Sequence, residues 1–263
     1  MDLSEKKILI SGGSAGIGKA LVDELIEKGA RDIAVMGRTK RKMDKLEERY
    51  PSANFLKIQG DVSQLVDIKN AISAIDEEWG ALDILVNNAG VVSASLLENL
   101  SDEDIISQIN INLTGLILLT KHALPLLKES SEGTIMNLSS GLGYIAMPFY
   151  SVYAATKSGV KHFSEAMRRE LAEYPIHVMT VFPTATDTPM METAKVDRAM
   201  DSPEEVARVS VKGLLEKEIN VILGGQQRID DIKENFEEPL KFDQKVAKLF
   251  DSLQVRAKEH RSM

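Results

Sequence analysis

The sequence has no cysteine, so it can form neither disulfide bonds nor thiolate metal sites, and it lacks a thiol nucleophile. Its four histidines show no spacing typical of metal ligands, and we predict no metal site. No apolar run approaches the roughly 20 residues that cross a bilayer. The net charge of −8 argues against a broad basic surface for nucleic acid. We therefore expect no metal, no membrane and no nucleic acid as partners.

The start of the chain lacks the apolar core of a secretory signal, and together with the absence of cysteine this favours the cytoplasm. Apolar residues make up 43% of the 263 residues and charged residues 27%, as in ordinary globular proteins. At about 150 residues per domain, this length allows one or two domains.

Short apolar runs alternate with helical patterns along most of the chain. Runs of this kind that are apolar throughout predict a parallel sheet with helices on both faces. Seven runs are strand candidates, at residues 8–10, 33–36, 55–58, 82–86, 134–138, 177–182 and 220–223. Ser101 and Ser202 are expected to cap the helices that follow them, each with an acidic residue three positions later.

The composition changes after residue 225, where the chain becomes strongly charged. Apolar residues recur there at helical spacing, and we expect Leu249, Phe250 and Leu253 to pack on the preceding domain or on a partner subunit. The sequence thus predicts one α/β domain over residues 1–225 and a charged helical C-terminal extension over residues 226–263.

A glycine-rich turn lies between the first strand and the first helix. Gly12, Gly16 and Gly18 would let the backbone turn tightly and approach a pyrophosphate at the helix N-terminus. No Gly-Lys-Ser/Thr follows, which excludes a Walker-type phosphate loop. The turn therefore predicts dinucleotide binding, and a purely structural turn is the alternative.

The spacing Gly-x-x-x-Gly-x-Gly resembles that of the short-chain dehydrogenase/reductase family. Further family motifs follow in order over about residues 5–225: Asp61-Val62, Asn87-Asn88-Ala89-Gly90, Asn112, Ser140 and Tyr153-x-x-x-Lys157. The resemblance implies a doubly wound, seven-stranded parallel Rossmann sheet of strand order 3-2-1-4-5-6-7. It also implies an NAD(P)(H)-dependent oxidoreductase that interconverts a carbonyl and an alcohol on a small molecule.

Tyr153 and Lys157 are four residues apart and therefore share one face of a helix. To act as acid and base near pH 7, the tyrosine pKa must fall by about 3 from about 10, which corresponds to about 4 kcal/mol. The Lys157 ammonium and the positive charge of an oxidised nicotinamide could supply this. A chance match on an amphipathic helix is the alternative, but only Tyr153 of the five tyrosines has such a lysine.

The resemblance assigns roles to four catalytic residues, namely Asn112, Ser140, Tyr153 and Lys157. Ser140 would hold the substrate oxygen, with the adjacent Ser139 as the competing candidate. Asn112 would bend its helix and hold a water next to the lysine, the alternative being a buried, satisfied amide. The expected dinucleotide contacts are Gly12, Ser14, Gly16, Ile17, Gly18, Arg38, Thr39, Asp61, Val62, Asn88, Ala89, Gly90, Tyr153, Lys157, Pro183, Thr186 and Thr188.

The residues after the second strand predict which dinucleotide is preferred. An NAD-selecting enzyme usually has Asp or Glu there, but this chain has Gly37, followed by Arg38 and Thr39. The Arg38 fork suits phosphate oxygens, so we predict a preference for NADP(H), with NAD(H) as the alternative. Ala15, where some relatives carry a basic residue, argues against it, and Arg38 could instead be the solvated start of a helix.

Several apolar residues are expected to wall the substrate pocket and to favour an apolar carbonyl or alcohol: Leu142, Tyr144, Met147, Phe149, Met190 and Met191. Residues 189–200 have few helix signals and are expected to form a mobile lid. Thr184 replaces a glycine that is usual in the family. A homodimer through the long helices is expected, with a tetramer as the alternative.

Two other functions compete with the oxidoreductase. A dinucleotide-sensing regulator with little turnover would be favoured by loss of Tyr153 or Lys157, and both are present. A Rossmann methyltransferase would usually place an acidic residue where Gly37 stands, and it would leave the Tyr-x-x-x-Lys pair unexplained.

Overall fold

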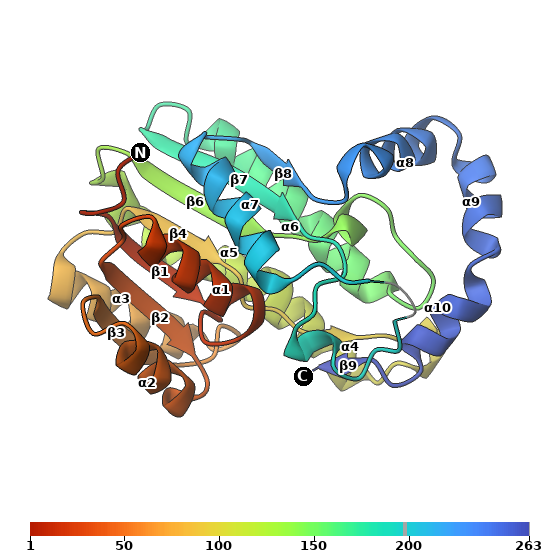
Figure 1. The fold of residues 1–263 in the computed structure, drawn as a ribbon, viewed down its shortest axis with the longest axis horizontal. Helices are drawn as coiled ribbons and strands as arrows, with labels where there is room; N and C mark the ends of the chain where they lie inside the picture. Colours follow the sequence, from red (N-terminus) through yellow and green to blue (C-terminus); the bar gives the residue numbers. More distant parts are fainter. Residues whose placement is uncertain (197–198, 263) are drawn as a thin grey trace.

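The computed structural model describes residues 1–196 and 199–262, and its centre is a sheet of seven parallel strands (Figure 1). The strands are β1 (Lys7–Ser11), β2 (Asp32–Gly37), β3 (Asn54–Gln59), β4 (Ile84–Asn87), β6 (Gly133–Leu138), β7 (Ile176–Phe182) and β8 (Asn220–Ile222). Their order is β3-β2-β1-β4-β6-β7-β8. This confirms the predicted order, because the label β5 belongs to a two-residue strand outside this sheet, Val92–Ser93.

Helices cover both faces of the sheet, as the apolar strands require. On one face lie α1 (Gly16–Glu27), α2 (Lys40–Arg49) and α7 (Pro203–Leu215), whose buried side chains share one apolar cluster with the strands. On the other face lie α3 (Leu65–Trp79), α5 (Leu116–Lys128) and α6 (Ser151–Glu170), which form a second cluster. No helix of the described residues is both long and apolar enough to cross a membrane.

Both predicted serine caps are present. The Ser101 hydroxyl accepts a hydrogen bond from the Asp104 backbone at 3.1 Å, and the Ser202 hydroxyl accepts one from the Glu205 backbone at 3.1 Å. These serines begin α4 (Asp102–Ile109) and α7, where the first backbone N–H groups have no partner within the helix.

The helix predicted to run on from Ser101 is interrupted. A π-helical segment, Asn110–Gly115, separates α4 from α5. Its last residue, Gly115, lies so close to the next layer that a Cβ there would stand 2.5 Å from the Val62 carbonyl oxygen. Backbone packing of this kind, which only glycine permits, is not visible as a break in the helical pattern.

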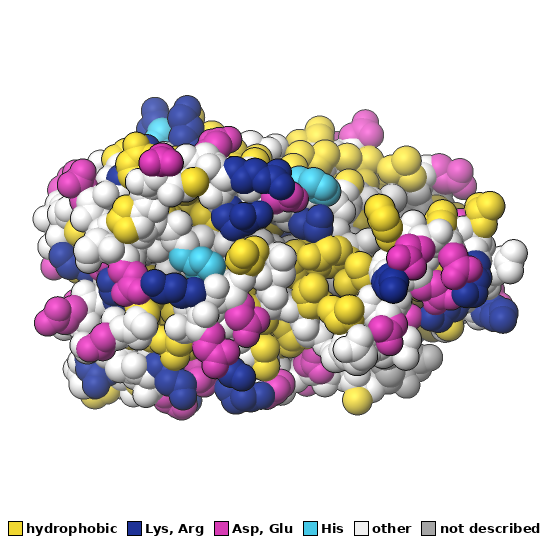
Figure 2. All heavy atoms as spheres, turned by 90° about the horizontal axis from the view of Figure 1, so that it is seen from above, with side chains coloured by type: hydrophobic (Ala, Val, Ile, Leu, Met, Phe, Trp, Pro, Cys, Tyr) yellow, Lys and Arg dark blue, Asp and Glu magenta, His cyan; other side chains and the backbone are white. Residues whose placement is uncertain are grey.

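The C-terminal segment after β8 forms α8 (Gly225–Glu237), α9 (Pro239–Ala247), α10 (Phe250–Ala257) and β9 (Arg261–Ser262); we call residues 225–262 the tail. Figure 1 shows the tail leaving β8, arching outward and returning beneath the carboxyl ends of the central strands. On the face drawn in Figure 2, apolar side chains lie between the domain and the charged outer end of the tail.

The end of the tail is fastened to the domain. β9 pairs antiparallel with β5, and the Arg261 guanidinium binds both carboxylate oxygens of Asp104, the shortest contact being 2.9 Å. The Phe250 ring packs on the Phe149 ring with centroids 5.0 Å apart. The helices of the tail agree with the sequence analysis, whereas its final strand does not, because two residues carry no strand pattern.

We expect truncation after Asn235 to lower the melting temperature by roughly 5 °C or more, since it removes the Phe250 contact, the β9 ladder and the Asp104–Arg261 pair. Phe236→Ser, which changes an apolar side chain that is 87% exposed, is the control and should melt like the wild type. Scanning calorimetry measures the melting temperature, and light scattering measures the oligomeric state. A truncated chain with unchanged melting and unchanged oligomeric state would refute a structural role for the tail.

Candidate active site

A cavity of about 650 Å³ lies at the carboxyl ends of the central strands, a size typical of ligand pockets. β1 turns into α1 while β4 leads to the other half of the sheet, so the strand order reverses between them. Ligands of doubly wound sheets bind at this crevice. The cavity extends from Arg38 and Thr39 to the inner side of the tail.

The glycine-rich turn forms one wall of the cavity and depends on the absence of side chains. Gly12 and Gly16 have φ values of +67° and +51°, which L side chains rarely adopt. A Cβ on Gly18 would stand 2.3 Å from the Gly12 carbonyl oxygen. The turn therefore exposes the backbone of residues 12–16 toward the cavity, as binding of a pyrophosphate requires.

The predicted dinucleotide contacts come together around this cavity. All of them line it except Gly18, which is buried beneath the turn. Asp61 and Val62 follow β3, and the Asp61 carboxylate accepts a hydrogen bond from the Ser63 backbone at 2.8 Å. Thr188, in the loop that follows β7, also lines the cavity, and its hydroxyl donates to the Thr186 carbonyl at 3.3 Å.

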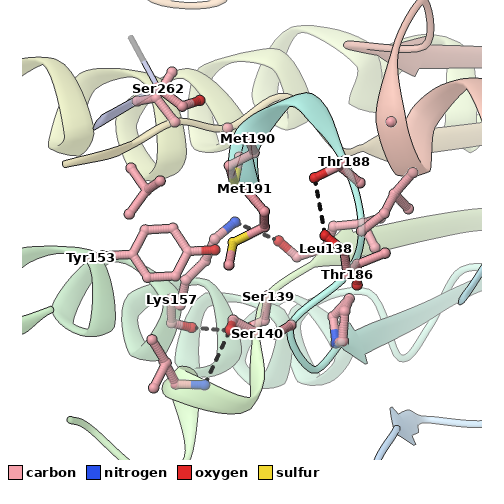
Figure 3. Close-up of a pocket in the computed structure, with 18 of the residues that line it drawn as sticks. Leu138, Ser139, Ser140, Tyr153, Lys157, Thr186, Thr188, Met190, Met191 and Ser262 are labelled. Atoms are coloured by element: carbon pink, nitrogen blue, oxygen red, sulfur yellow. Dashed lines mark hydrogen bonds between the residues drawn. The ribbon is translucent and has the colours of Figure 1, made fainter. Parts of the chain in front are cut away.

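Three of the four predicted catalytic residues, Ser140, Tyr153 and Lys157, line the same cavity (Figure 3). The Lys157 ammonium donates to the Leu138 carbonyl at 2.9 Å and lies 5.6 Å from the centre of the Tyr153 ring. α6 supplies the tyrosine and the lysine, and the loop after β6 supplies the serine. The fold thus brings all three to the carboxyl ends of the strands.

The two adjacent serines differ in their partners. The Ser139 hydroxyl is buried and donates to the Lys157 carbonyl at 2.8 Å, which ties the loop to α6. The Ser140 hydroxyl accepts from the Leu142 backbone at 3.1 Å and hydrogen-bonds the Tyr153 side chain in the cavity wall. This difference favours Ser140 as the group that meets a substrate oxygen.

Burial controls the protonation of the pair. It raises the pKa of Tyr153 to about 12, with the Ser140 hydroxyl acting in the opposite direction, and it lowers the pKa of Lys157 to about 8. The groups of this chain alone therefore raise the tyrosine pKa, and its fall beside the charge of an oxidised nicotinamide stays a prediction. Burial thus keeps the tyrosine neutral, whereas a lysine with a pKa of about 8 still carries its proton in most molecules at pH 7.

Asn112 lies beside the cavity rather than in its wall. It is 1% exposed, and its side chain accepts from the Val91 backbone at 2.8 Å and donates to the Val91 carbonyl at 2.9 Å. It sits in the π-helical segment, and its oxygen is the nearest atom to a Cβ that would be added at Gly90. Asn112 therefore holds the loop after β4 next to Lys157.

Four of the six predicted wall residues, Leu142, Met147, Met190 and Met191, line the cavity. Tyr144 and Phe149 do not, which corrects the prediction for these two. The Tyr144 ring packs on Phe182, 4.4 Å between centroids, and Phe149, with a φ of +73°, turns its ring toward Phe250 of the tail. The predicted lid begins with a short 3₁₀ helix, Pro189–Met191, and residues 197 and 198 of it lie outside the described residues.

Comparison with known proteins agrees with this geometry. A sequence model of the family described as short chain dehydrogenase matches residues 6–199. An uncharacterized short-chain type dehydrogenase/reductase of Sinorhizobium fredii is 36% identical over 187 residues, which cover 71% of this chain and 72% of that protein. An uncharacterized oxidoreductase of Staphylococcus aureus is 28% identical over 221 residues, 83% of this chain and 95% of that protein.

The chain belongs to the short-chain dehydrogenase/reductase family. It is an oxidoreductase by this membership, and family members use NAD(P)(H) and small-molecule substrates. Within residues 1–196 and 199–262, no group of three His, Asp or Glu side chains could hold a metal ion.

The family match ends before the tail, and the sequence analysis missed what the tail does. In this short-chain dehydrogenase/reductase the tail forms the wall of the cavity opposite the glycine-rich turn. The tail residues that line it include Phe242, Val246, Leu249, Leu253, Arg256 and His260. The helical spacing of its apolar residues indicated helices. It held no signal for the residues that those helices would face.

His260 joins the tail to the substrate side of the cavity. Its ring bridges the Tyr150 hydroxyl, at 2.9 Å, and the Met190 carbonyl, at 3.0 Å. With the hydrogen on the nitrogen that faces Met190, the other nitrogen accepts from Tyr150. Burial and the nearby Arg256 charge lower the pKa of His260 to about 4, opposed by the Met190 hydrogen bond.

This low pKa predicts that acid lowers the free energy of unfolding. Once unfolded or detached, His260 binds a proton with its ordinary pKa of 6.5, so the folded form binds fewer protons between pH 6.5 and about 4. Stability should be full above pH 6.5 and fall as the pH drops, with a limiting slope of about 1.4 kcal/mol per pH unit.

Urea unfolding at pH 7 and pH 5 measures this effect. His260→Gln keeps a donor and an acceptor but cannot titrate, so the difference in unfolding free energy between the two pH values should be smaller than in the wild type. Equal differences for both proteins would show that His260 does not contribute.

Proposed function

We propose that this protein is an NADP(H)-dependent oxidoreductase that interconverts a carbonyl and an alcohol on a small, apolar molecule. The observation that carries the proposal is the convergence of Ser140, Tyr153 and Lys157 on one cavity with the glycine-rich turn. The regulatory alternative would gain support from a site without Tyr153 or Lys157, and both line this cavity.

The residues present fit a dinucleotide. The exposed backbone of the glycine-rich turn would receive the pyrophosphate, and Asp61 and Val62 would receive the adenine. Thr188, whose side chain lies 3.2 Å from where a Gly16 Cβ would be, would meet the nicotinamide end. When bound, the nicotinamide supplies or accepts the hydride.

The chain's own groups handle the proton. The Ser140 hydroxyl would hold the substrate oxygen and Tyr153 would donate its phenolic proton to that oxygen in reduction. A raised tyrosine pKa keeps this proton on the phenol. Lys157, fixed by Leu138, would reach the ribose and lend its charge whenever it is protonated.

We expect Tyr153→Phe to retain cofactor affinity and to lose turnover by a factor on the order of 10² or more, because only the phenolic proton is removed. Lys157→Ala should weaken both. Cofactor binding is measured by calorimetry, and turnover by nicotinamide absorbance with a panel of ketones and aldehydes. Near-normal turnover by Tyr153→Phe on any substrate would defeat the assignment.

The preference for NADP(H) rests on the end of β2. Gly37 leaves no carboxylate to repel a 2′-phosphate, and the neighbouring Ser14, Arg38 and Thr39 line the cavity with a guanidinium and two hydroxyls. Lys42, which the sequence analysis did not single out, lines it as well. A charge-assisted hydrogen bond to a phosphate corresponds to roughly a ten- to hundredfold preference.

We expect kcat/KM to be higher for NADPH than for NADH, and the double variant Gly37→Asp, Arg38→Leu to reverse the order. A Cβ at Gly37 would stand 3.4 Å from the Ser14 hydroxyl, so the fold can accept the new side chain. Lys40→Leu, a charge change on an exposed residue of α2 that does not line the cavity, is the control. Equal values in the wild type, or an excess for NADH, would contradict the proposal.

Self-association belongs to the same proposal. The homodimer expected through the long helices would cover apolar side chains on α4 that the described chain leaves exposed, Ile106 at 56% and Ile109 at 40%.

A further inference from the structure

The substrate side of the cavity has an unbalanced positive charge. The charged residues that line the whole cavity are Arg38, Lys42, Asp61, Lys157, Arg228, Asp231, Lys245 and Arg256. Asp61 lies at the adenine end, and Asp231 is paired with Lys245 at 2.6 Å. No acidic residue of the described cavity wall is therefore left to balance a charge beside Tyr153.

Arg256 contributes to this unbalanced positive charge close to Tyr153. It reaches the cavity from α10, with its guanidinium carbon 5.4 Å from the centre of the Tyr150 ring, and its charge acts on both Tyr150 and Tyr153. Its Nε is buried and has no hydrogen-bond partner among the described residues. No carboxylate within residues 1–196 and 199–262 pairs with it.

The groups around Arg256 cannot neutralise it. The Tyr150 hydroxyl hydrogen-bonds both His260 and the Arg256 side chain, but as a neutral group it brings no negative charge. The His260 imidazole is neutral as well, because burial lowers its pKa to about 4. Arg256 is half-buried, and its buried Nε donor is unfavourable without a partner unless an acceptor arrives with the ligand. The apolar side chains of Leu142, Met147 and Leu253 line the same part of the cavity.

We propose that Arg256 binds a carboxylate of the substrate, so that the protein acts on oxo acids or hydroxy acids whose carboxylate is separated from the reacting carbon by an apolar group. A guanidinium can bind both oxygens of a carboxylate, which fixes orientation as well as charge. Arg256 is thus a specificity-determining residue supplied by the tail. This inference rests on the proposed function, because it concerns the substrate of the same site.

The test compares acids with their neutral counterparts. The probes are 4-acetylbenzoate, methyl 4-acetylbenzoate and 4-acetylbenzamide, reduced by wild type, Arg256→Met and Arg256→Lys. In the wild type, kcat/KM for the acid should exceed that for the ester and the amide by roughly ten- to a hundredfold. Arg256→Met should bring the ratio close to one through KM, and Arg256→Lys should restore part of it.

The control and a second measurement separate folding from recognition. Lys258→Met removes one positive charge at the exposed end of α10 and should keep the wild-type ratio. Calorimetric titration of the NADP(H)-loaded protein with 4-isopropylbenzoate, which has the acid but no carbonyl, measures binding without turnover. The same titration with phenyl phosphate distinguishes a carboxylate site from a general anion site.

Each outcome decides the question. Loss of 4-isopropylbenzoate binding in Arg256→Met, but not in Lys258→Met, supports the inference even if no probe is turned over. Where the probes are turned over, loss of the acid preference in Arg256→Met alone supports it as well. Turnover of all three ketones at equal rates, unchanged in Arg256→Met, overturns it while leaving the proposed oxidoreductase intact. Tighter binding of phenyl phosphate than of the benzoate also overturns the carboxylate assignment.

Discussion

The site depends on how the ends of β1 and β4 are joined. Ser11 and Asn87 are paired at the last position of these strands, and beyond them the two segments of the chain diverge. The Ser11 hydroxyl accepts from the backbones of Asn88, at 3.1 Å, and Ala89, at 3.2 Å, and the Asn88 side chain donates to the Ser11 and Gly12 carbonyls, each at 3.1 Å. These hydrogen bonds hold open the crevice that the glycine-rich turn borders.

A second set of buried polar contacts connects the ends of these strands to α6, which carries Tyr153 and Lys157. The Asn87 amide donates to Thr120 of α5, at 2.9 Å, and to Asn137 of β6, at 2.8 Å, and the Asn137 amide donates to Ser164 of α6 at 2.9 Å. Three such hydrogen bonds made together favour one geometry, although the Asn87 side-chain oxygen is buried without a partner among the described residues. This network therefore fixes α6 against the sheet and limits where Tyr153 and Lys157 can lie.

The sheet and the cofactor side of the site could be predicted because their signals are local. Apolar runs such as residues 134–138 give strands, and Gly12, Tyr153 and Lys157 stand in short motifs of known order. The substrate side could not, because its contacts are long-range. Arg261 and Asp104 are 157 positions apart, and nothing in the spacing of tail residues relates Arg256 to Tyr150. The positive φ of Phe149, which removes its ring from the cavity, likewise has no local signal.

The cavity also determines which of its side chains are charged. Burial keeps the Tyr153 phenol neutral and lowers the pKa of Lys157 to about 8, and the tail, which lines the same cavity, adds the fixed charge of Arg256. Arginine cannot lose its proton in a protein, so Arg256 stays ionised when the cavity excludes water. An anionic substrate would compensate that charge, and the phenol would remain a proton donor. In the proposed mechanism, substrate recognition by the tail and proton transfer by α6 would thus be parts of one electrostatic balance, although the two segments are distant in sequence.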